Sequence, residues 1–390
     1  MKAMPWMNVR AVALVTVGTL VVAGGGGTGA SKLAAAQPSV ASAAPTSESP
    51  LDKLKPGEWY EAPNSKLSGS GVWPPQPTPP GNPIAMIKAW SGGAYDAKRD
   101  RLILHGGGHG DYAGNEIYAF DIKTFKWSRP WGPSKEFPNI ALQPDGLDAY
   151  PDGNPASVHS YDGMVYLPVQ DKLWRGGGAL WSGSGRGTRA CWLFDFDTLK
   201  WERKADSLTL GVGVFARYDP VTGHVFAASD RSVLQEYDPS TNTWTGPVKD
   251  VLDRGEETTS ALDPENRLFV GIGNGKLNIY NIKTRIITNR QRTTGGEVIV
   301  NARGPGLAYD PVIKRIVGWS GGTSVYSLNI STWTWTEHKA AGTNSVTPTA
   351  PTRVGVFGRF QYIPSKNVYI LVNEVDQNVF FYKLSPATKQ

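Results

Sequence analysis

Side chains capable of acid–base chemistry gather in residues 105–116, HGGGHGDYAGNE. His109 and Tyr112 stand three residues apart, and the glycines on both sides of His109 allow a ligand to approach the backbone closely. A histidine can remove a proton near neutral pH, and a tyrosine can donate one. Because the segment is more polar than a turn between strands requires, it predicts a functional loop.

The residues around this loop predict the strands that hold it. Residues 102–104 form a short apolar run before three glycines, residues 116–121 are mostly apolar and aromatic, and a polar turn at 123–124 precedes Trp127. These patterns favour strand, loop, strand, turn and strand. An apolar strand that ends in glycines, then Tyr and Asp, and then a Trp six residues after the Asp resembles the kelch repeat of β-propellers.

The same pattern recurs along the chain. A Tyr/Leu-Asp-Pro anchor or a variant of it occurs at 95–96, 166–168, 218–220, 262–264, 309–311 and 362–364, with successive starts 44 to 71 residues apart. The downstream half recurs as an aromatic residue or leucine, then Asp or Asn, then a later tryptophan, most clearly at 120–127, 194–201, 237–244 and 328–335. Repeats of this length with four short strands each are typical of propellers.

The chain is therefore expected to be all-β, a β-propeller of kelch-like four-stranded blades. We expect six blades, with seven as the alternative, since the widest spacing contains a proline-rich stretch at 130–155 that suits a long loop. The last copy stops soon after Tyr382 without a Trp-bearing outer strand, whereas Trp59 stands alone before the first copy. A strand at Trp59 should complete the final blade and close the ring, which leaves no open sheet edge.

The amino-acid composition limits which partners and cofactors the chain is expected to bind. The chain has 390 residues, of which 40% are hydrophobic and 45 are glycine, so it can bury a large core between many turns. Its one cysteine, Cys191, excludes an intramolecular disulfide framework and any multi-cysteine metal site. The net charge of +6 favours polyanionic partners in general, and the lack of a Lys/Arg run argues against nucleic acid. We expect a monomer without a cofactor, and a structural metal ion stays open.

The N-terminal sequence predicts export. Residues 1–36 have the layout of a secretory signal peptide, with Lys2 and Arg10 ahead of a short apolar run and small residues. Residues 37–56 are rich in Ala, Ser, Pro and Thr and are expected to be a disordered linker, followed by the propeller at 57–388. The protein should therefore be secreted or periplasmic, with no membrane contact after signal cleavage. An uncleaved anchor is the alternative, although the apolar run is short for a span.

Propeller geometry sorts the candidate residues onto one face. Loops that join the second strand of a blade to the third emerge on the same side of the ring as loops that lead into the next blade. The candidates there are the acid–base residues His109, Tyr112, His159 and Tyr161 and the ligand-binding residues His105, Asn115, Arg175, Arg186, Arg189, Arg231, Arg303 and Arg353. Guanidinium groups suit carboxylate or sulfate groups and keep their charge. Each arginine alone is also consistent with a solvated surface residue.

The repeated aromatic residues, such as Phe120 and Trp127, suit a core between blades better than a surface on which a ligand stacks.

From Trp59 to residue 384 the chain resembles bacterial secreted kelch-type propellers, a superfamily that includes the galactose oxidase propeller and propeller-shaped lyases of ulvan-like uronic acid polymers. The lyase resemblance implies a His and a Tyr as base and acid, with arginine and a second His neutralising the uronate carboxylate. In this sequence His109 would be the base, Tyr112 or Tyr161 the acid, and Arg175 or Arg189 with His159 the carboxylate clamp. Galactose oxidase needs copper, two Tyr, two His and a Cys–Tyr crosslink, for which this chain has no convincing counterpart.

Two functions remain open. In the first, the protein binds an acidic extracellular polysaccharide or cleaves it by β-elimination, which needs a base, an acid and positive charge on the carboxylate. A glycosidase would need two carboxylates facing each other across a sugar, and Asp111 and Glu116 are close only in sequence. In the second, a non-catalytic propeller binds a protein or envelope partner through the same mouth, because the fold alone does not fix the function.

Overall fold

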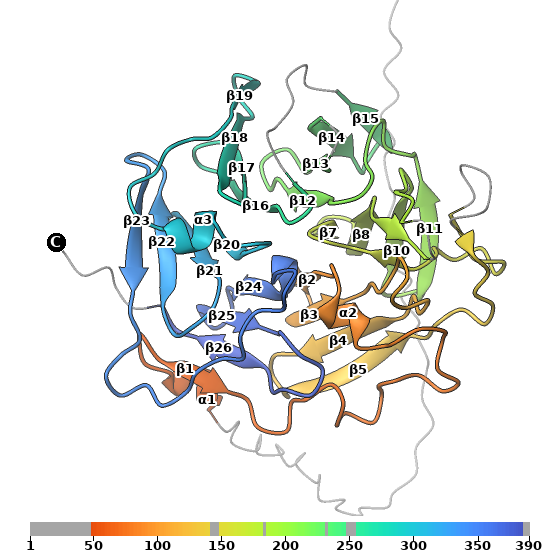
Figure 1. Ribbon diagram of the computed structural model, residues 1–390, viewed down its shortest axis with the longest axis horizontal. Coiled ribbons are helices and arrows are strands. Elements are labelled where there is room, and N and C mark those ends of the chain that lie inside the picture. Colours follow the sequence, from red (N-terminus) through yellow and green to blue (C-terminus); the bar gives the residue numbers. More distant parts are fainter. Residues whose placement is uncertain (1–47, 141–147, 182–184, 231–232, 247–254, 385–390) are drawn as a thin grey trace, which may run out of the picture. The chain divides into compact units, whose positions relative to one another are not determined.

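The described residues form a six-bladed β-propeller (Figure 1). The computed structural model describes residues 48–140, 148–181, 185–230, 233–246 and 255–384. Six antiparallel sheets of four strands each are present in these ranges, which confirms the all-β prediction and the six blades and makes the seven-blade alternative wrong. In Figure 1 the first strand of each blade lies nearest the centre of the ring.

The blades follow one another along the chain. The first contains β2 (Gly93–Asp96), β3 (Arg101–Leu104), β4 (Ile117–Asp121) and β5 (Lys126–Trp131), and the second β7 (Met164–Leu167), β8 (Lys172–Gly176), β10 (Cys191–Asp195) and β11 (Lys200–Lys204). The third contains β12 (Phe215–Tyr218), β13 (Val225–Ala228), β14 (Gln235–Asp238) and β15 (Thr243–Thr245), and the fourth β16 (Thr259–Asp263), β17 (Leu268–Gly273), β18 (Lys276–Asn281) and β19 (Ile286–Thr288). The fifth contains β20 (Gly306–Asp310), β21 (Arg315–Trp319), β22 (Val325–Asn329) and β23 (Thr334–His338), and the sixth β24 (Phe360–Ile363), β25 (Val368–Leu371), β26 (Phe380–Tyr382) and β1 (Trp59–Glu61).

Few elements lie outside the blades. They are the strand pair β6 (Val158–His159) and β9 (Ala179–Leu180) and the short helices α1 (Pro50–Lys53), α2 (Ala85–Lys88), α3 (Glu297–Val300) and η2 (Phe357–Arg359). None of the helices in the described ranges is long and apolar enough to cross a membrane. Among the described residues between β5 and β7, β6 is the only strand, as expected from the prolines of this stretch.

The expected domain boundaries fall partly outside the described residues. The expected signal peptide at 1–36 lies wholly outside them, and the expected linker at 37–56 lies outside them up to residue 47. From residue 48 the chain is already attached to the propeller, since Leu51 of α1 is buried in the hydrophobic core that includes Phe381. The ordered body therefore begins earlier than the expected boundary at residue 57.

The recurring acidic residues have a local structural task. At the turn between the third and fourth strands, Asp121 Oδ1 accepts hydrogen bonds from the backbone N–H groups of Lys123 at 3.0 Å and Thr124 at 2.7 Å. The equivalent Asp or Asn makes the same kind of turn in the next four blades, at Asp195, Asp238, Asn281 and Asn329. Such side-chain-capped turns explain why an acid or amide recurs at this point of the repeat.

The recurring aromatic residues fill the space between blades, as expected. Phe120 packs against Trp127 of its own blade with ring centroids 5.0 Å apart, and it approaches Phe381 of the sixth blade at 6.4 Å. Trp174 of the second blade packs against Tyr237 of the third at 6.3 Å. These residues are buried and are not available to a ligand.

The strand β1 closes the ring, which confirms the predicted role of Trp59. It pairs antiparallel with β26, so that Trp59 stands opposite Tyr382. The indole of Trp59 is 3% exposed, donates a hydrogen bond to the carbonyl of Thr323 at 2.9 Å, and packs on the Tyr382 ring at 4.8 Å. The N-terminal strand therefore joins the fifth and sixth blades to the start of the chain.

Replacing Trp59 by Ala should lower the free energy of unfolding by about 3–5 kcal/mol, because a buried indole and its hydrogen bond are lost. Chemical denaturation monitored by circular dichroism measures the loss. Val221→Ala is the matched control, since Val221 is 63% exposed and should be near neutral. A Trp59 variant as stable as the control would contradict closure through β1.

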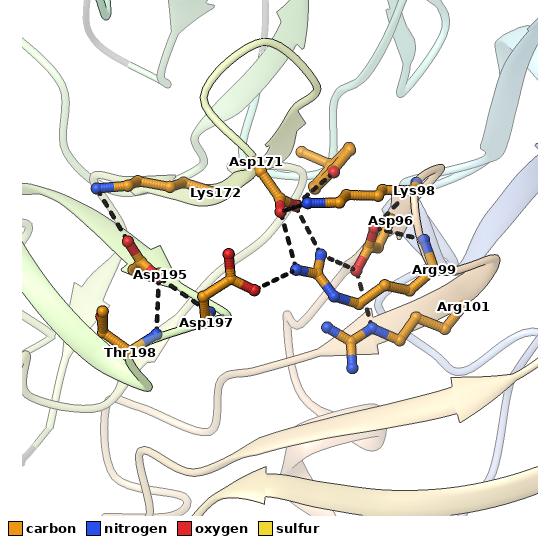
Figure 2. A network of polar contacts seen from close by, with 10 residues as sticks. Asp96, Lys98, Arg99, Arg101, Asp171, Lys172, Asp195, Asp197 and Thr198 are labelled. Carbon is orange, nitrogen blue, oxygen red and sulfur yellow. Dashed lines mark hydrogen bonds and ion pairs between the residues drawn. The ribbon is translucent and has the colours of Figure 1, made fainter. Parts of the chain in front are cut away.

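Polar contacts join the first and second blades on the face of the first-to-second strand turns (Figure 2). Arg99 binds Asp171 of the second blade through both nitrogens, at 2.6 and 2.9 Å, and reaches Asp197 at 3.1 Å. Asp96, which is fully buried, accepts from Arg99 at 3.2 Å and from Arg101 at 2.8 Å. The Arg99 hydrogen bonds hold the pKa of Asp171 well below its usual range.

Arg99→Ala should destabilise the protein by about 2 kcal/mol, because it removes the cation that the carboxylates of Asp96, Asp171 and Asp197 share. The contribution depends on ionised Asp171, so it is present above the unfolded pKa of an aspartate and is lost as the pH falls below it. Lys314→Ala is the control, since it removes an exposed ion pair with Glu265 and should cost less than about 1 kcal/mol. Equal unfolding midpoints for the two variants would contradict this assignment.

Candidate functional site

A pocket of about 680 Å³ opens on the face formed by the second-to-third strand loops and the loops between blades. Its walls come from the first three blades and from the loop that enters the fourth. The polar side chains that line it include His109, Asp111, His159, Tyr161, Asp230 and Glu256, and Trp90 supplies an aromatic wall. Three of the four predicted acid–base residues, His109, His159 and Tyr161, therefore line one pocket.

The His159–Asp111 pair lies at this pocket. His159 Nε2 is 2.7 Å from Asp111 Oδ2, and the imidazole is nearly fully buried while Asp111 is half-exposed. Burial lowers the pKa of His159, with Asp111 opposing this effect, and the hydrogen bond from His159 lowers the pKa of Asp111. The histidine is therefore neutral near pH 7. A proton on Nε2, shared with Asp111, leaves Nδ1 as the basic nitrogen.

Backbone geometry explains how this pair is assembled. His159 ends β6, which pairs with β9 so that His159 stands opposite Ala179. The loop that carries Asp111 packs against β6 at Gly108. A Cβ atom at this position would lie 2.0 Å from the backbone nitrogen of His159. Gly108 also has a positive φ of 50°. A glycine is required here because any side chain would push Asp111 away from His159.

His109 lies over the same pair. Its ring is 5.6 Å from the His159 ring, centroid to centroid, and the two planes are tilted by 32°. Gly185 leaves room for it, since a side-chain carbon at Gly185 would lie 2.5 Å from His109 Nε2. His109 is half-buried and has a positive φ of 41°. This backbone conformation is strained for a histidine, and the side chain lines the pocket.

Tyr161 forms part of the pocket wall. Its ring meets His159 edge-on at 6.0 Å and Phe357 edge-on at 6.1 Å. Burial raises the pKa of the Tyr161 hydroxyl, and Glu256 and Glu257 add to this effect. The hydroxyl therefore stays protonated near neutral pH and is available as a hydrogen-bond donor.

Trp90 is held by a polar relay. The indole stacks near His159 with centroids 5.2 Å apart and donates to Glu257 Oε1 at 3.2 Å. Glu257 also accepts from Asn274 at 3.1 Å and from Arg303, which makes a short contact with it. Burial raises the pKa of Glu257, but the hydrogen bonds from Arg303, Trp90 and Asn274 outweigh it and leave that pKa below its usual value. An ionised Glu257 therefore fixes the indole.

Three predicted residues of the first-blade loop are structural. Tyr112 is fully buried, and its hydroxyl donates to Glu116 at 2.9 Å. His105 is also fully buried, with Nδ1 3.2 Å from the Glu116 carbonyl, and burial lowers its pKa to about 3. Asn115 binds Ser134 and the Pro155 carbonyl at 2.9 and 2.8 Å. Glu116 is buried as well and does not face Asp111 across the pocket.

The predicted arginines do not line the pocket in the described part of the chain. Arg175 is 1% exposed on β8, donates to the Gly177 carbonyl at 3.3 Å, and has its pKa lowered by burial to about 10. Arg186 donates to the Ile140 carbonyl at 3.2 Å, and Arg303 belongs to the Trp90 relay. Arg189 and Arg353 are exposed, and Arg231 lies outside the described residues.

Several pocket residues escaped sequence reasoning. Trp90, Asp230 and Glu256 come from loops of different blades, and each occurs in a stretch without a motif. A usable signal was their position, since Trp90 and Glu256 precede the first strands of the first and fourth blades. Loops that lead into a blade emerge on the pocket side, so this position puts both residues on the same face as His159.

No protein-family model matches the chain, and no curated protein sequence matches it. Within the described ranges, no group of three or more His, Cys, Asp or Glu side chains is arranged to hold a metal ion. The fold and the pocket together define a six-bladed propeller with a histidine–aspartate pair in a loop-built pocket.

The relay predicts that Arg303 controls the position of Trp90. In Arg303→Ala, the indole N–H resonance of Trp90, assigned through its loss in Trp90→Phe, should shift or broaden in a two-dimensional NMR spectrum. Arg353→Ala is the control, because Arg353 is exposed in the loop that leads into the sixth blade on the same face. An unchanged Trp90 resonance in Arg303→Ala would show that Glu257 holds the indole without Arg303.

Proposed function

We propose that this protein is a secreted, kelch-type propeller that binds an extracellular polysaccharide in the pocket around His159. The observation that carries the proposal is the aromatic wall of Trp90 beside the His159–Asp111 pair. Aromatic rings stack on the apolar faces of sugars, while carboxylates and imidazoles bind their hydroxyl groups. The pocket volume of about 680 Å³ suits a few sugar units.

The charge around the pocket suggests how an acidic polymer would lie. Asp111, Asp230 and Glu256 line the pocket, and these carboxylates favour sugar hydroxyls over sugar carboxylates. Arg189 and Arg353 are exposed on the same face and suit the acidic groups of neighbouring sugars. An acidic polymer would then place a hydroxyl-rich unit in the pocket and its carboxylates on the rim.

The same residues support a second activity, β-elimination at a uronic acid unit. A neutral His159 oriented by Asp111 suits the base that removes the proton beside the carboxylate, and the protonated Tyr161 hydroxyl suits the acid for the leaving oxygen. His109 is placed beside them and would contact the substrate. This assignment moves the base from His109 to His159 and leaves Tyr161 as the acid.

The test combines binding and turnover across a panel of neutral and uronic acid polysaccharides. Trp90→Ala should weaken binding at least about tenfold, a loss of about 1.4 kcal/mol. If the protein is a lyase, His159→Gln should lower the formation of unsaturated sugar about a hundredfold while binding persists. Binding of acidic members should weaken as salt rises, because rim charges are screened.

Arg285→Ala is the matched control, since Arg285 lies exposed on the opposite face at the turn after β18. It should change neither binding nor turnover, and thermal melting verifies that every variant is folded. Binding without product in the unaltered protein would leave a non-catalytic propeller. No binding to any polysaccharide would overturn the proposal in favour of a protein partner.

A further inference from the structure

A second pocket, of about 420 Å³, lies on the other face of the ring, where the first-to-second strand turns meet around the central axis. The recurring proline anchors build it, as Asp-Pro in three blades and as Leu-Pro or Ile-Pro in two. Five blades, the second to the sixth, each contribute one proline to its wall: Pro168, Pro220, Pro264, Pro311 and Pro364. The motif that marks the repeat in the sequence therefore also forms a common surface in space.

The rest of this wall is mainly apolar and aromatic. Tyr218, Tyr309 and Tyr362 stand one residue before the end or at the end of the first strands and line the pocket with Leu262 and Leu307. Proline carries no backbone N–H and has a fixed φ, so this wall is poor in backbone donors and rigid. Such a surface suits the apolar body of a small ligand.

Arg217 is the charged side chain among the described residues that line this pocket. Its NH1 nitrogen lies 2.9 Å from Asp162 Oδ2 and 2.6 Å from the Ala216 carbonyl. Its NH2 nitrogen is buried and has no hydrogen-bond partner among the described residues, and neither does the buried hydroxyl of Tyr309. Buried donors without partners are costly, so both groups favour an acceptor from outside the chain.

Three of the neighbouring aspartates have partners within the chain, whereas Oδ1 of Asp162, which pairs with Arg217 through Oδ2, has none among the described residues. Asp219 is bound by both guanidinium nitrogens of Arg267, at 2.5 and 2.6 Å. Asp310 accepts the hydroxyl of Tyr369 at 2.5 Å, and Asp263 caps its own turn at 2.9 and 3.0 Å. Asp219 and Asp310 are thus bound by residues of the next blade and Asp263 by its own turn, while Arg217 NH2 has no acceptor among the described residues.

We propose that this second pocket binds a small organic acid, with its apolar body against the proline and tyrosine wall and its carboxylate on Arg217 NH2 and the Tyr309 hydroxyl. A carboxylate is favoured over a neutral group because guanidinium–carboxylate hydrogen bonds are about twice as strong as neutral ones. The site is independent of the proposed polysaccharide pocket, since the two share no lining residue.

Titration of the purified protein by calorimetry and ligand-observed NMR tests this site with four probes. Phenylacetate and hexanoate carry a carboxylate on an aromatic or an aliphatic body, glucuronate carries it on a sugar, and 2-phenylethanol lacks the charge. Phenylacetate or hexanoate should bind saturably and at least about tenfold more tightly than 2-phenylethanol. Glucuronate as the best probe would instead identify the source of the acid as a sugar and would support the carboxylate contact.

Two conservative variants identify the contact residues. Arg217→Lys keeps a cation for Asp162 but removes the NH2 donor, and it should weaken phenylacetate binding at least about tenfold. Tyr309→Phe removes only the hydroxyl and should weaken binding severalfold, which keeps the proposal testable if the Arg217 variant does not fold. His159→Gln, in the other pocket, should leave phenylacetate binding unchanged even if polysaccharide binding fails. Absent binding of all three acids, equal binding of 2-phenylethanol, or unchanged affinity in both Arg217→Lys and Tyr309→Phe would overturn the proposal.

Discussion

Packing between neighbouring blades is the interaction on which the rest of this structure depends. A four-stranded blade is apolar on both faces, so it can be stable only when a further blade covers each face. Phe120 of the first blade meets Phe381 of the sixth, and β1 completes the sixth blade by pairing with the strand that carries Phe381. The ring closes through side-chain packing and strand pairing, without a disulfide at Cys191. Turns and loops add to this packing, as the Arg99–Asp171 and Tyr161–Phe357 contacts do, and the loops of one face also build the pocket around His159.

Ring closure also explains how the pocket tolerates strained backbone. His109, Tyr161 and Phe357 have positive φ values of 41°, 47° and 52°, each of which costs about 1–3 kcal/mol for a side chain other than glycine. Tyr161 and Phe357 contact each other edge-on, although they come from loops that enter the second and sixth blades. Rigid blades hold both loops in place, with Tyr161 packed between His159 and Phe357.

The sequence was sufficient for the blades because each recurring residue has a local physical reason. An Asp that caps its own turn and a Trp that fills the space beside the next blade recur at fixed intervals. Both can therefore be recognised from the sequence without the tertiary structure.

The pocket was harder to predict. The rule for loop faces put His109, His159 and Tyr161 on one side, but Tyr112, three residues from His109, turns inward onto Glu116. Arg175 shows the same limit, because its position near a loop gave no sign that its side chain is buried. Proximity between long loops of different blades depends on packing that spacing does not encode.

Hydrogen–deuterium exchange with and without a bound polysaccharide tests the central claim most directly, because it locates the ligand without altering the protein. If the polysaccharide binds around His159, exchange should slow in the loops that surround the pocket, at 105–116, 157–163 and 209–213. No change is expected in the third-to-fourth strand turns, such as 121–126 and 281–286, which lie on the opposite face. Protection confined to those turns, with the loops around His159 unchanged, would contradict that claim.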